Sequence, residues 1–423
     1  MYIIFIGLTF LIIISVPIYF SIGITSAVYI LYEKLSGIII AQRMVTGLDS
    51  FTLLAIPCFI LAGQLMNSSG ITKRIFNFAI CLVGSIPGGL GMANIVASII
   101  FAGMSGASVA DIGGLGAIEI KAMTDEGYDI DFSVGITIAS SLVGPIIPPS
   151  INIILFASIA GASVGKLFLG GVIPGLVLGL FLMIQVYIVA KKRGYPCHPR
   201  PTITKIINSF KEAFLPLGMP VIILGGIVSG IVTPTEAAVI AVLYALFLGI
   251  VVYRTLRLKE LYKVLYDTVI MTATIGVVIA AASAFGWVLT HARIPHMVGD
   301  FILNYTSNRY VFLFIVNVIL LIVGCFLDQG ASILILTPIL LPIAKSLDID
   351  IIHFGILMVL TLQIGLLTPP VGLGVFIGSQ VANISITRTF KAVQLFYYSC
   401  LAAIIIITLF PFFTLFLPNL LMR

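Results

Sequence analysis

Charged residues are scarce in this sequence. Asp, Glu, Lys and Arg make up 9% of its 423 residues, whereas 60% are hydrophobic and the mean hydropathy is +1.22. A soluble protein usually carries about 25% charged residues, which cover its surface. The scarcity of charge therefore excludes a soluble globular protein and indicates a multi-pass protein embedded in a lipid bilayer.

Other absences narrow the class of function. The five cysteines are scattered and odd in number, so they indicate neither a disulfide framework nor a metal site. The four histidines lack metal-ligand spacing, and the sequence has no Walker A loop for ATP. We find no paired nucleophile and base and no two facing acids, so we expect no enzyme activity and no organic cofactor.

The sequence contains several long apolar runs. Residues 2–32, 169–190, 311–325 and 399–417 are among the runs expected to span a hydrocarbon core, which needs ~20 residues. We count roughly ten to twelve crossings, because a broken segment is read either as one crossing or as two half-crossings. The run 2–32 lacks the short apolar core and the cleavage site of a signal peptide, so we expect it to be retained as the first span.

The net charge of +6 comes largely from two short loops. Residues 191–211 contain six basic residues and no acid, and residues 254–263 contain four with one acid. The positive-inside rule places both loops in the cytoplasm, so we expect no nucleic-acid partner. An even number of crossings must separate them. A break at Thr233-Pro234-Thr235-Glu236 divides the stretch between them into two, and Glu236 is expected to cap the helix after Pro234.

Two matching motif sets lie about 220 residues apart. Each set has a Gly-Ala-Ser triplet, then a proline pair with a glycine four residues before it. The sets are Gly106-Ala107-Ser108, Gly144 and Pro148-Pro149, and Gly330-Ala331-Ser332, Gly365 and Pro369-Pro370. Repeated apolar segments interrupted by glycine and proline are typical of secondary transporters, with the site near the bilayer midplane.

The motif sets predict an internal repeat. We expect a first repeat at 1–193, a cytoplasmic linker at 194–212 and a second repeat at 213–423. Each repeat would contain scaffold spans, a connector helix, a hairpin and a broken helix. The connectors are expected at about 33–49 and 254–266, and the second would precede a span at 268–290.

The segments around the triplets, 101–120 and 326–344, are too interrupted to be ordinary spans and suit re-entrant hairpins. At a hairpin tip, carbonyl and hydroxyl oxygens suit a hard cation, and N–H groups suit a carboxylate. The alternative is close helix packing by small residues. Because the triplet recurs together with its proline pair, we favour an ion site.

Each proline pair predicts an unwound helix, because two successive donors are lost and the preceding turn is blocked. The freed carbonyl groups need a cation, a bound water or the facing hairpin tip as partner. Ser150, Asn152 and Thr368 add oxygen atoms nearby. A simple proline kink satisfied by neighbouring helices is the alternative.

Two runs resemble the large membrane subunit of tripartite ATP-independent periplasmic (TRAP) transporters. They are LDQGASILILTPILLP at 327–342 and GIVTPTEAA at 230–238. The similarity extends over essentially the whole chain. It implies an all-α, inverted-repeat, elevator-type transporter with two re-entrant hairpins and two proline-broken helices. The family imports organic anions, such as C4-dicarboxylates or sugar acids, with sodium as coupling ion. Its partners are a small four-helix membrane subunit and a periplasmic substrate-binding protein, in the bacterial inner membrane.

The resemblance also assigns candidate site residues. It places one sodium ion at Ser105, Gly106 and Ser108 with Gly144 and Pro148, and a second at Gly330 and Ala331 with Gly365 and Thr368. Asn152, Arg293 and Asp328 are the expected substrate contacts. Gln329-Gly330 departs from the hydroxyl residues expected there, which weakens the case for side-chain ligation at the second tip.

Alternatives remain at this point. Arg293 suits either a bidentate contact with a substrate carboxylate or the anchoring of a span end at the interface. A self-sufficient sodium/dicarboxylate symporter fits the same motifs. An ion channel should instead show a filter repeated by oligomeric symmetry, and an intramembrane enzyme a catalytic pair.

Overall fold

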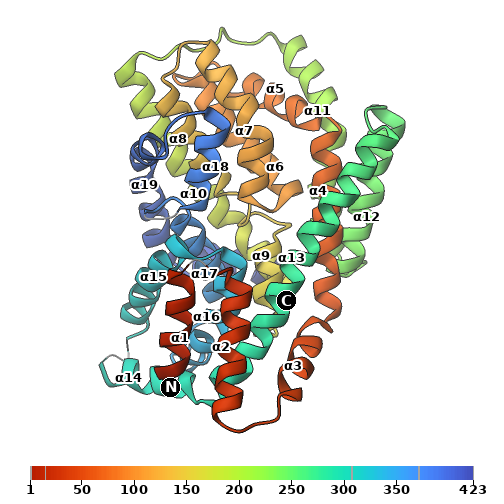
Figure 1. The fold of residues 1–423 in the computed structure, drawn as a ribbon. Coiled ribbons are helices and arrows are strands. Elements are labelled where there is room, and N and C mark those ends of the chain that lie inside the picture. Colours follow the sequence, from red (N-terminus) through yellow and green to blue (C-terminus); the bar gives the residue numbers. More distant parts are fainter. Residues whose placement is uncertain (1, 15, 306–307, 370–371, 423) are drawn as a thin grey trace.

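The computed structural model describes all residues except 1, 15, 306–307, 370–371 and 423, and in the described part of the chain every regular element is helical (Figure 1). The helices are α1 (Tyr2–Ile13), α2 (Ile18–Tyr32), α3 (Ile38–Leu48), η1 (Phe51–Leu54), α4 (Ala55–Ser68), α5 (Ile71–Val83), α6 (Gly89–Ser105), α7 (Ser108–Asp125), α8 (Ile130–Ser141), α9 (Ile151–Ala160), α10 (Val164–Arg193), α11 (Ile203–Val228), α12 (Pro234–Leu246), η2 (Phe247–Val252), α13 (Leu258–His291), α14 (Ile294–Tyr305), α15 (Arg309–Phe326), α16 (Gln329–Ser346), α17 (Ile351–Gly365), α18 (Leu373–Ala382), α19 (Ile386–Leu409) and α20 (Phe412–Leu421).

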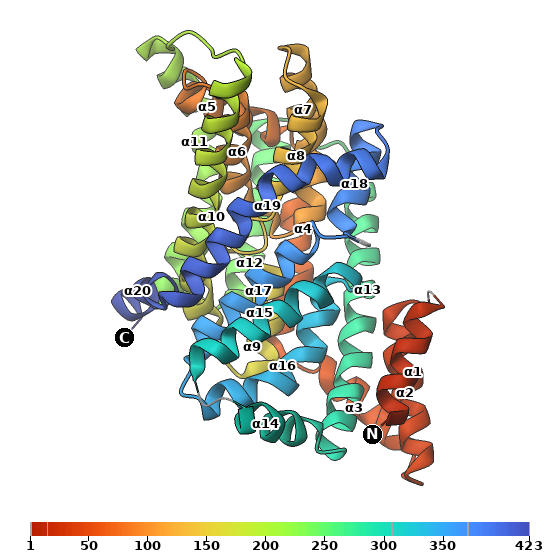
Figure 2. The ribbon, with the colours of Figure 1, turned by 90° about the vertical axis from the view of Figure 1, so that its left-hand side faces the viewer.

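The helices form two groups that pack side by side. The outer group contains α2, α3, α4, α12 and α13, and α13 crosses its length in contact with α2, α3 and α4 (Figure 1). The central group contains α6 to α10 and α15 to α20, which pack on one another around the two proline-broken segments (Figure 2). The groups meet where α13 packs on α16 and α4 packs on α6.

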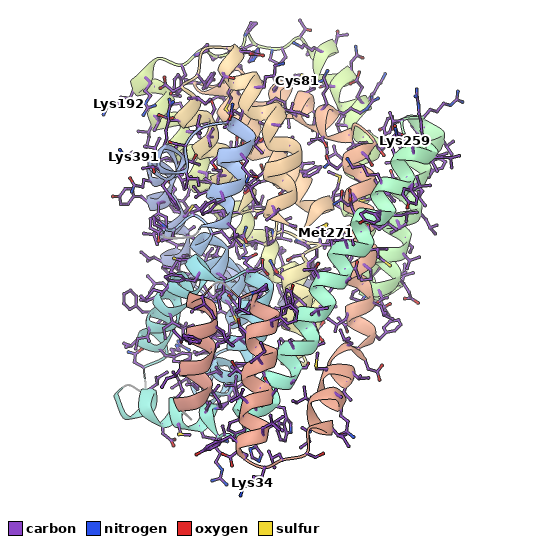
Figure 3. The ribbon with its side chains drawn as sticks, in the orientation of Figure 1. Lys34, Cys81, Lys192, Lys259, Met271 and Lys391 are labelled. Carbon is purple, nitrogen blue, oxygen red and sulfur yellow. The ribbon has the colours of Figure 1, made fainter. Side chains whose placement is uncertain are left out.

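The basic loops lie at one end of the molecule, as predicted. Figure 3 shows Lys192, Lys259 and Lys391 at that end and Lys34 at the other. The positive-inside rule predicts that the first end faces the cytoplasm. The helices α11 and α12 connect the two basic loops, with the predicted break between them. At this break the Thr233 hydroxyl accepts from the backbone N–H of Glu236 at 3.3 Å, and the Glu236 carboxylate accepts from the N–H of Thr233 at 2.7 Å. The capping role of Glu236 is confirmed.

Three expected spans have different limits in the structure. The run 2–32 is not one span but two helices, α1 and α2, which pack against each other, and Pro17 precedes the second helix. The run 399–417 is divided in the same way, because α19 ends at Leu409 and Pro411 precedes α20. A proline lacks the N–H that would continue the helix, so each run folds as two pieces.

The third difference is a merger. The connector expected at 254–266 and the span expected at 268–290 form the single 34-residue helix α13. No proline lies within α13, so nothing in its sequence ends the helix between the two parts. By length and composition, eight helices of the described chain can cross a membrane. The shorter apolar helices include both halves of each proline-broken segment, α8 with α9 and α17 with α18.

Candidate functional site

The first tip turn, residues 106–107, joins α6 to α7. Gly106 has φ +60° and Ala107 is extended, so the chain reverses within two residues and α7 begins at Ser108. A Cβ atom on Gly106 would lie 2.6 Å from the carbonyl oxygen of Pro149. The left-handed conformation and this close approach both require glycine. The side chain of Ser105, an expected sodium ligand, lies outside the described residues.

The first break, residues 142–150, packs behind this turn. Ser108 Oγ donates to the carbonyl oxygen of Ser141 at 2.7 Å, and Ser150 Oγ donates to that of Pro145 at 2.5 Å. Ser150 also caps α9 by accepting from the N–H of Ile153. The two hydroxyl groups therefore satisfy part of the carbonyl groups at the first break. The hydroxyl of Ser108 comes from the facing tip, which is one of the partners expected from the sequence.

Two further glycines hold the first break in place. A Cβ on Gly144 would lie 2.6 Å from Oδ2 of Asp111, a buried residue of α7. A Cβ on Gly171 of α10 would lie 2.1 Å from the carbonyl oxygen of Ile146. The backbone of the break is thus enclosed by α7 and α10, and Pro148 is buried with it.

The second tip turn, residues 327–328, joins α15 to α16 and differs from the first. Asp328 caps α16, because its Oδ2 accepts from the N–H of Gly330 at 2.9 Å. Gly330 and Ala331 lie in the first helical turn, not in the tip turn as Gly106 and Ala107 do. The two triplets therefore match in sequence but occupy different positions relative to the turn.

The second break, residues 366–372, packs against the end of α15. A Cβ on Gly365 would lie 2.7 Å from Cα of Gly324, so the two helices touch through glycine. The N–H of Gly372 donates to the carbonyl oxygen of Cys325 at 3.3 Å. Thr368 Oγ1 lies 3.4 Å from the hydroxyl of Tyr397. Pro370 of the motif lies outside the described residues.

Two amide contacts join the halves of the chain. Asn152 Nδ2 donates to Oε1 of Gln329 at 2.5 Å, which connects α9, after the first break, to the start of α16. Gln363 Nε2 donates to Ser108 Oγ, which connects α17, before the second break, to the start of α7. Each contact joins a tip of one half to the broken helix of the other.

Sequence reasoning missed Gln363 and mentioned Gln329 only as a departure. Gln363 is fully buried, and it lies two residues before Gly365 in an apolar helix. A lone amide in such a run must find a hydrogen-bond partner when it is buried, and this is the signal that was available.

A cavity of about 500 Å³ lies between the two tips and α13. Its lining includes 106–109 from the first tip, 328–330 from the second, and Asn152. Met271, Thr274 and Val278 of α13 face it from the outer group, and Figure 3 shows Met271 midway between the two ends of the molecule. Asp328 is the only charged residue among the described lining residues, and none of them is Lys, Arg or His.

The structure brings together only part of the predicted site. Gly106, Ser108, Asn152, Asp328 and Gly330 line one cavity. The other predicted sodium ligands do not line it. They are Gly144, Pro148, Ala331, Gly365 and Thr368, which belong to the tips or the breaks behind it.

Arg293 lies outside this cavity. It follows α13 with φ +56° and is exposed. The nearest cavity residue along the chain, Val278, is in α13 about 22 Å away at 1.5 Å per residue. The position is that of a residue ending a helix, which agrees with the interface-anchor alternative.

Comparisons with known proteins show which proteins this chain resembles in sequence. The sequence model described as the DctM component of the tripartite ATP-independent periplasmic transporters matches residues 5–413. The chain is 44% identical to the sialic acid TRAP transporter large permease protein SiaM of Vibrio cholerae, over 96% of this chain and 95% of that protein. It is 41% identical to the C4-dicarboxylate TRAP transporter large permease protein DctM of Pseudomonas aeruginosa, over 94% of each.

A solved structure is similar in fold. The YdaH transporter of Alcanivorax borkumensis superposes with a TM-score of 0.61 over 86% of each chain, at 12% sequence identity. At this identity the likeness concerns the fold alone. The related permeases are transporters, which agrees with the expectation of a transport protein.

Proposed function

Since this chain belongs to the DctM family of tripartite ATP-independent periplasmic transporters, we propose that it is the large membrane subunit of a sodium-driven importer of an organic acid. It would act in the bacterial inner membrane, with its basic end in the cytoplasm. The substrate would bind in the 500 Å³ cavity between the two tips.

The charge of this cavity carries the proposal. A carboxylate substrate needs positive charge around it once it leaves water. The described lining has no basic side chain and contributes one acid, Asp328. The positive charge must then come from bound cations and from helix N-termini. The N-terminus of α7 is one such helix start, because it has no side-chain cap and lines the cavity. When anion binding depends on bound cations, the two binding equilibria are coupled, and this supports transport driven by the cation gradient.

The proposed sodium ligands are those expected from the sequence. The first ion would lie among Ser105, Gly106, Ser108, Gly144 and Pro148. This proposal is supported by the contacts of the first tip with the first break. Backbone and hydroxyl oxygens at such positions suit a hard cation.

The second ion would lie among Gly330, Ala331, Gly365 and Thr368. Support is weaker here, because Gly365 packs on Gly324 whereas the neighbours of Gly330 are Asp328 and Leu155. Asn152 and Asp328 are proposed to contact the substrate, and Gln329 joins them through its bond with Asn152. We leave Arg293 out of the substrate site.

We propose an elevator mechanism in which the central group moves against the outer group and the helix pairs act as re-entrant hairpins. Glycines of the central group that pack closely on α4 and on α11 support this proposal, since α4 belongs to the outer group and α11 packs on α12. A Cβ on Gly103 of α6 would lie 2.6 Å from Cγ of Pro220 in α11, and one on Gly114 of α7 would lie 2.7 Å from the amide nitrogen of Asn67 in α4. Small residues let the helix backbones approach closely at this boundary.

Two smaller cavities support a route along the same boundary. One of about 390 Å³ is lined by Asp49, Ser158 and Ser283 and shares Leu155 and Leu334 with the main cavity. The other, of about 230 Å³, includes Gln64 and Asn67 of α4. It shares Ala107, Ile151 and Met271 with the main cavity.

The partners follow from family membership. We propose that a small membrane subunit packs on the outer group and that a periplasmic binding protein delivers the acid. The related permeases are named for sialic acid and for C4-dicarboxylates, so both classes are candidates here. A self-sufficient sodium/dicarboxylate symporter is the alternative.

Reconstitution tests this function. The chain is placed in liposomes with and without the two proposed partners, under an inward sodium gradient, and uptake of sialic acid and C4-dicarboxylates is measured. We expect uptake only with both partners and with sodium. Uptake by the isolated chain would support the self-sufficient symporter, and uptake independent of sodium would contradict the proposed coupling. Arg293→Ala, outside the cavity, is the matched control for cavity variants.

A further inference from the structure

A buried hydrogen-bond network connects α6, α7 and α8 in the first half of the chain. Asn94 is its centre: Nδ2 donates to Thr137 Oγ1 and to Glu119 Oε2, both at 2.8 Å, and Oδ1 accepts from Ser140 Oγ at 2.6 Å. Ser98 Oγ donates to Ser140 Oγ at 3.0 Å. All five side chains are buried, so the network is closed off from solvent.

The second half contains a similar network centred on an asparagine, without an acid, and this network joins α15 to α17 and α19 rather than to α16. Asn317 Oδ1 accepts from Thr361 Oγ1 at 3.0 Å, and its Nδ2 donates to Thr408 Oγ1 at 2.9 Å. Thr361 and Ser140 each lie four residues before the glycine of their break. Asn317 Nδ2 therefore has a neutral hydroxyl as its acceptor, as Asn94 Nδ2 has in Thr137. Glu119 is an additional acceptor that appears in the first half, and the presence of a buried carboxyl group there calls for its own explanation.

The surroundings of Glu119 do not stabilise a negative charge. The side chain is 1% exposed. Oε2 has the single hydrogen bond from Asn94, and Oε1 has no hydrogen-bond partner among the described residues. A buried carboxylate without a paired cation is much less stable than a neutral carboxyl group with one unsatisfied O–H.

No basic residue of the packed helices compensates this charge. The helices α6 and α18 carry no charged residue, and on α8 Asp131 is paired with Arg388 at the surface. On α5, Arg74 lies over the ring of Tyr253 and Lys73 is exposed. The remaining titratable groups on α5 and α7 are Cys81, Asp111, Lys121 and Asp125. In the described chain no ion pair includes Glu119.

We propose that Glu119 is a proton-binding site of the first half. One proton from the solvent at the end of α7, where Lys121 and Asp125 are exposed, adds to the carboxylate at Oε1 and leaves a neutral carboxyl group. No other atom is exchanged. Loss of the proton places a negative charge on α7, the helix that begins at the first tip. Transport then depends on pH through Glu119, an effect that rests on the proposed function, whereas proton binding itself does not.

Infrared spectroscopy tests proton binding without transport. Full-length wild-type protein and Glu119→Gln are compared in lipid nanodiscs at neutral pH, each before and after exchange into deuterium oxide. We expect a band of a protonated carboxyl group in the wild type that is missing from Glu119→Gln and present in Ser98→Ala. The Ser98 variant is the matched control, because it alters the same network but keeps the acid. If Glu119→Gln does not fold, Glu119→Asp is used, and its band should shift.

A missing band at neutral pH in the wild type would overturn the proposal, since Glu119 would then be ionised. Uptake over a series of pH values is the second measurement. We expect the wild type to change by at most about tenfold per pH unit, as a single proton allows, and Glu119→Gln to lose this dependence while Ser98→Ala keeps it. A band with no change in pH dependence would leave the proton site intact and contradict its link to transport.

Discussion

The two helix pairs begin their second helices in opposite ways. In the first pair, α7 starts after Ala107 without a side-chain cap, and its first residues line the cavity. In the second pair, the Asp328 carboxylate accepts from the N–H of Gly330 and closes the start of α16. The carboxylate of the second pair therefore lies in the tip turn itself, whereas the first acid of α7, Asp111, lies behind the first tip, beside Gly144. Matching triplets in a sequence do not imply matching electrostatics.

The backbone around the triplets differs as well. Gly106 is left-handed and touches the first break, whereas Gly330 is helical and its closest neighbours are Asp328 Oδ2 and Leu155. The comparison predicts that the same substitution has different consequences at the two positions. It also predicts that removing the Asp328 carboxylate from the second tip affects uptake, whereas the turn of the first tip has no such side chain.

The largest effect is expected for Gly106→Ala. An alanine at φ +60° costs ~1–2 kcal/mol, and displacing the Pro149 carbonyl group costs ~1–3 kcal/mol more. Gly330→Ala should change stability by less than about 1 kcal/mol, because alanine favours a helix and the nearest atoms lie 3.2–3.3 Å from its Cβ. Thermal unfolding and uptake of both variants measure the difference. Equal effects would remove the distinction between the two turns.

The next effect concerns charge in the cavity. Asp328→Asn removes the only charged side chain of the described lining and should weaken the apparent substrate affinity by about 10- to 150-fold, the value of a charge-assisted hydrogen bond of ~1.5–3 kcal/mol between Asp328 and a substrate hydroxyl. Arg293→Ala should leave uptake near that of the wild type. If Arg293→Ala instead weakens substrate affinity tenfold, Arg293 contacts the substrate in a state that this structure does not represent.

The sequence predicted the breaks better than the contacts that hold them. A proline pair marks where a helix must end, because a missing N–H acts locally. The merger of 254–266 with 268–290 into α13 was missed, since no local signal separates a connector from a span. The partners of Gln329 and Gln363 depend on how distant helices pack, so sequence position alone gave no indication of them.

A third prediction concerns the amide contacts between the halves. Asn152→Ala and Gln329→Ala each remove the hydrogen bond that joins them, worth ~0.5–1.5 kcal/mol, and should weaken apparent substrate affinity by about 2- to 13-fold. Gln329→Ala also removes the bond from Gln329 Nε2 to the carbonyl oxygen of Val359 at 3.4 Å. Because the two residues share one bond, the double variant should be hardly weaker than either single variant. Fully additive losses would show that Asn152 and Gln329 act independently. Gln363→Ala is the parallel change at the other contact.

The smallest effect concerns two aspartates about 220 residues apart, Asp129 before α8 and Asp350 before α17. Asp350 caps its own helix by accepting from the N–H of Ile352 at 2.7 Å. Asp129 does not cap α8. It accepts from the Tyr195 hydroxyl at 2.6 Å and from Arg193 at 2.8 Å, and these hydrogen bonds, Tyr195 first, lower the pKa of Asp129 below its ordinary value. The first aspartate thus fixes the end of α10, and the second stabilises a helix start.

Asp350→Ala should lower the free energy of unfolding by ~1 kcal/mol, because it removes the cap of α17. Asp129→Asn should lower it by less than about 1 kcal/mol, because the Asp129–Arg193 pair is exposed. A lowered folded-state pKa stabilises the fold above the unfolded value of 3.8, and this contribution is lost as the pH falls through the folded value. The difference in melting temperature between wild type and Asp129→Asn should therefore be present at pH 7 and shrink under acidic conditions. A difference that persists after Asp129 is protonated would mean that packing around Tyr195, rather than charge, holds α8 to α10.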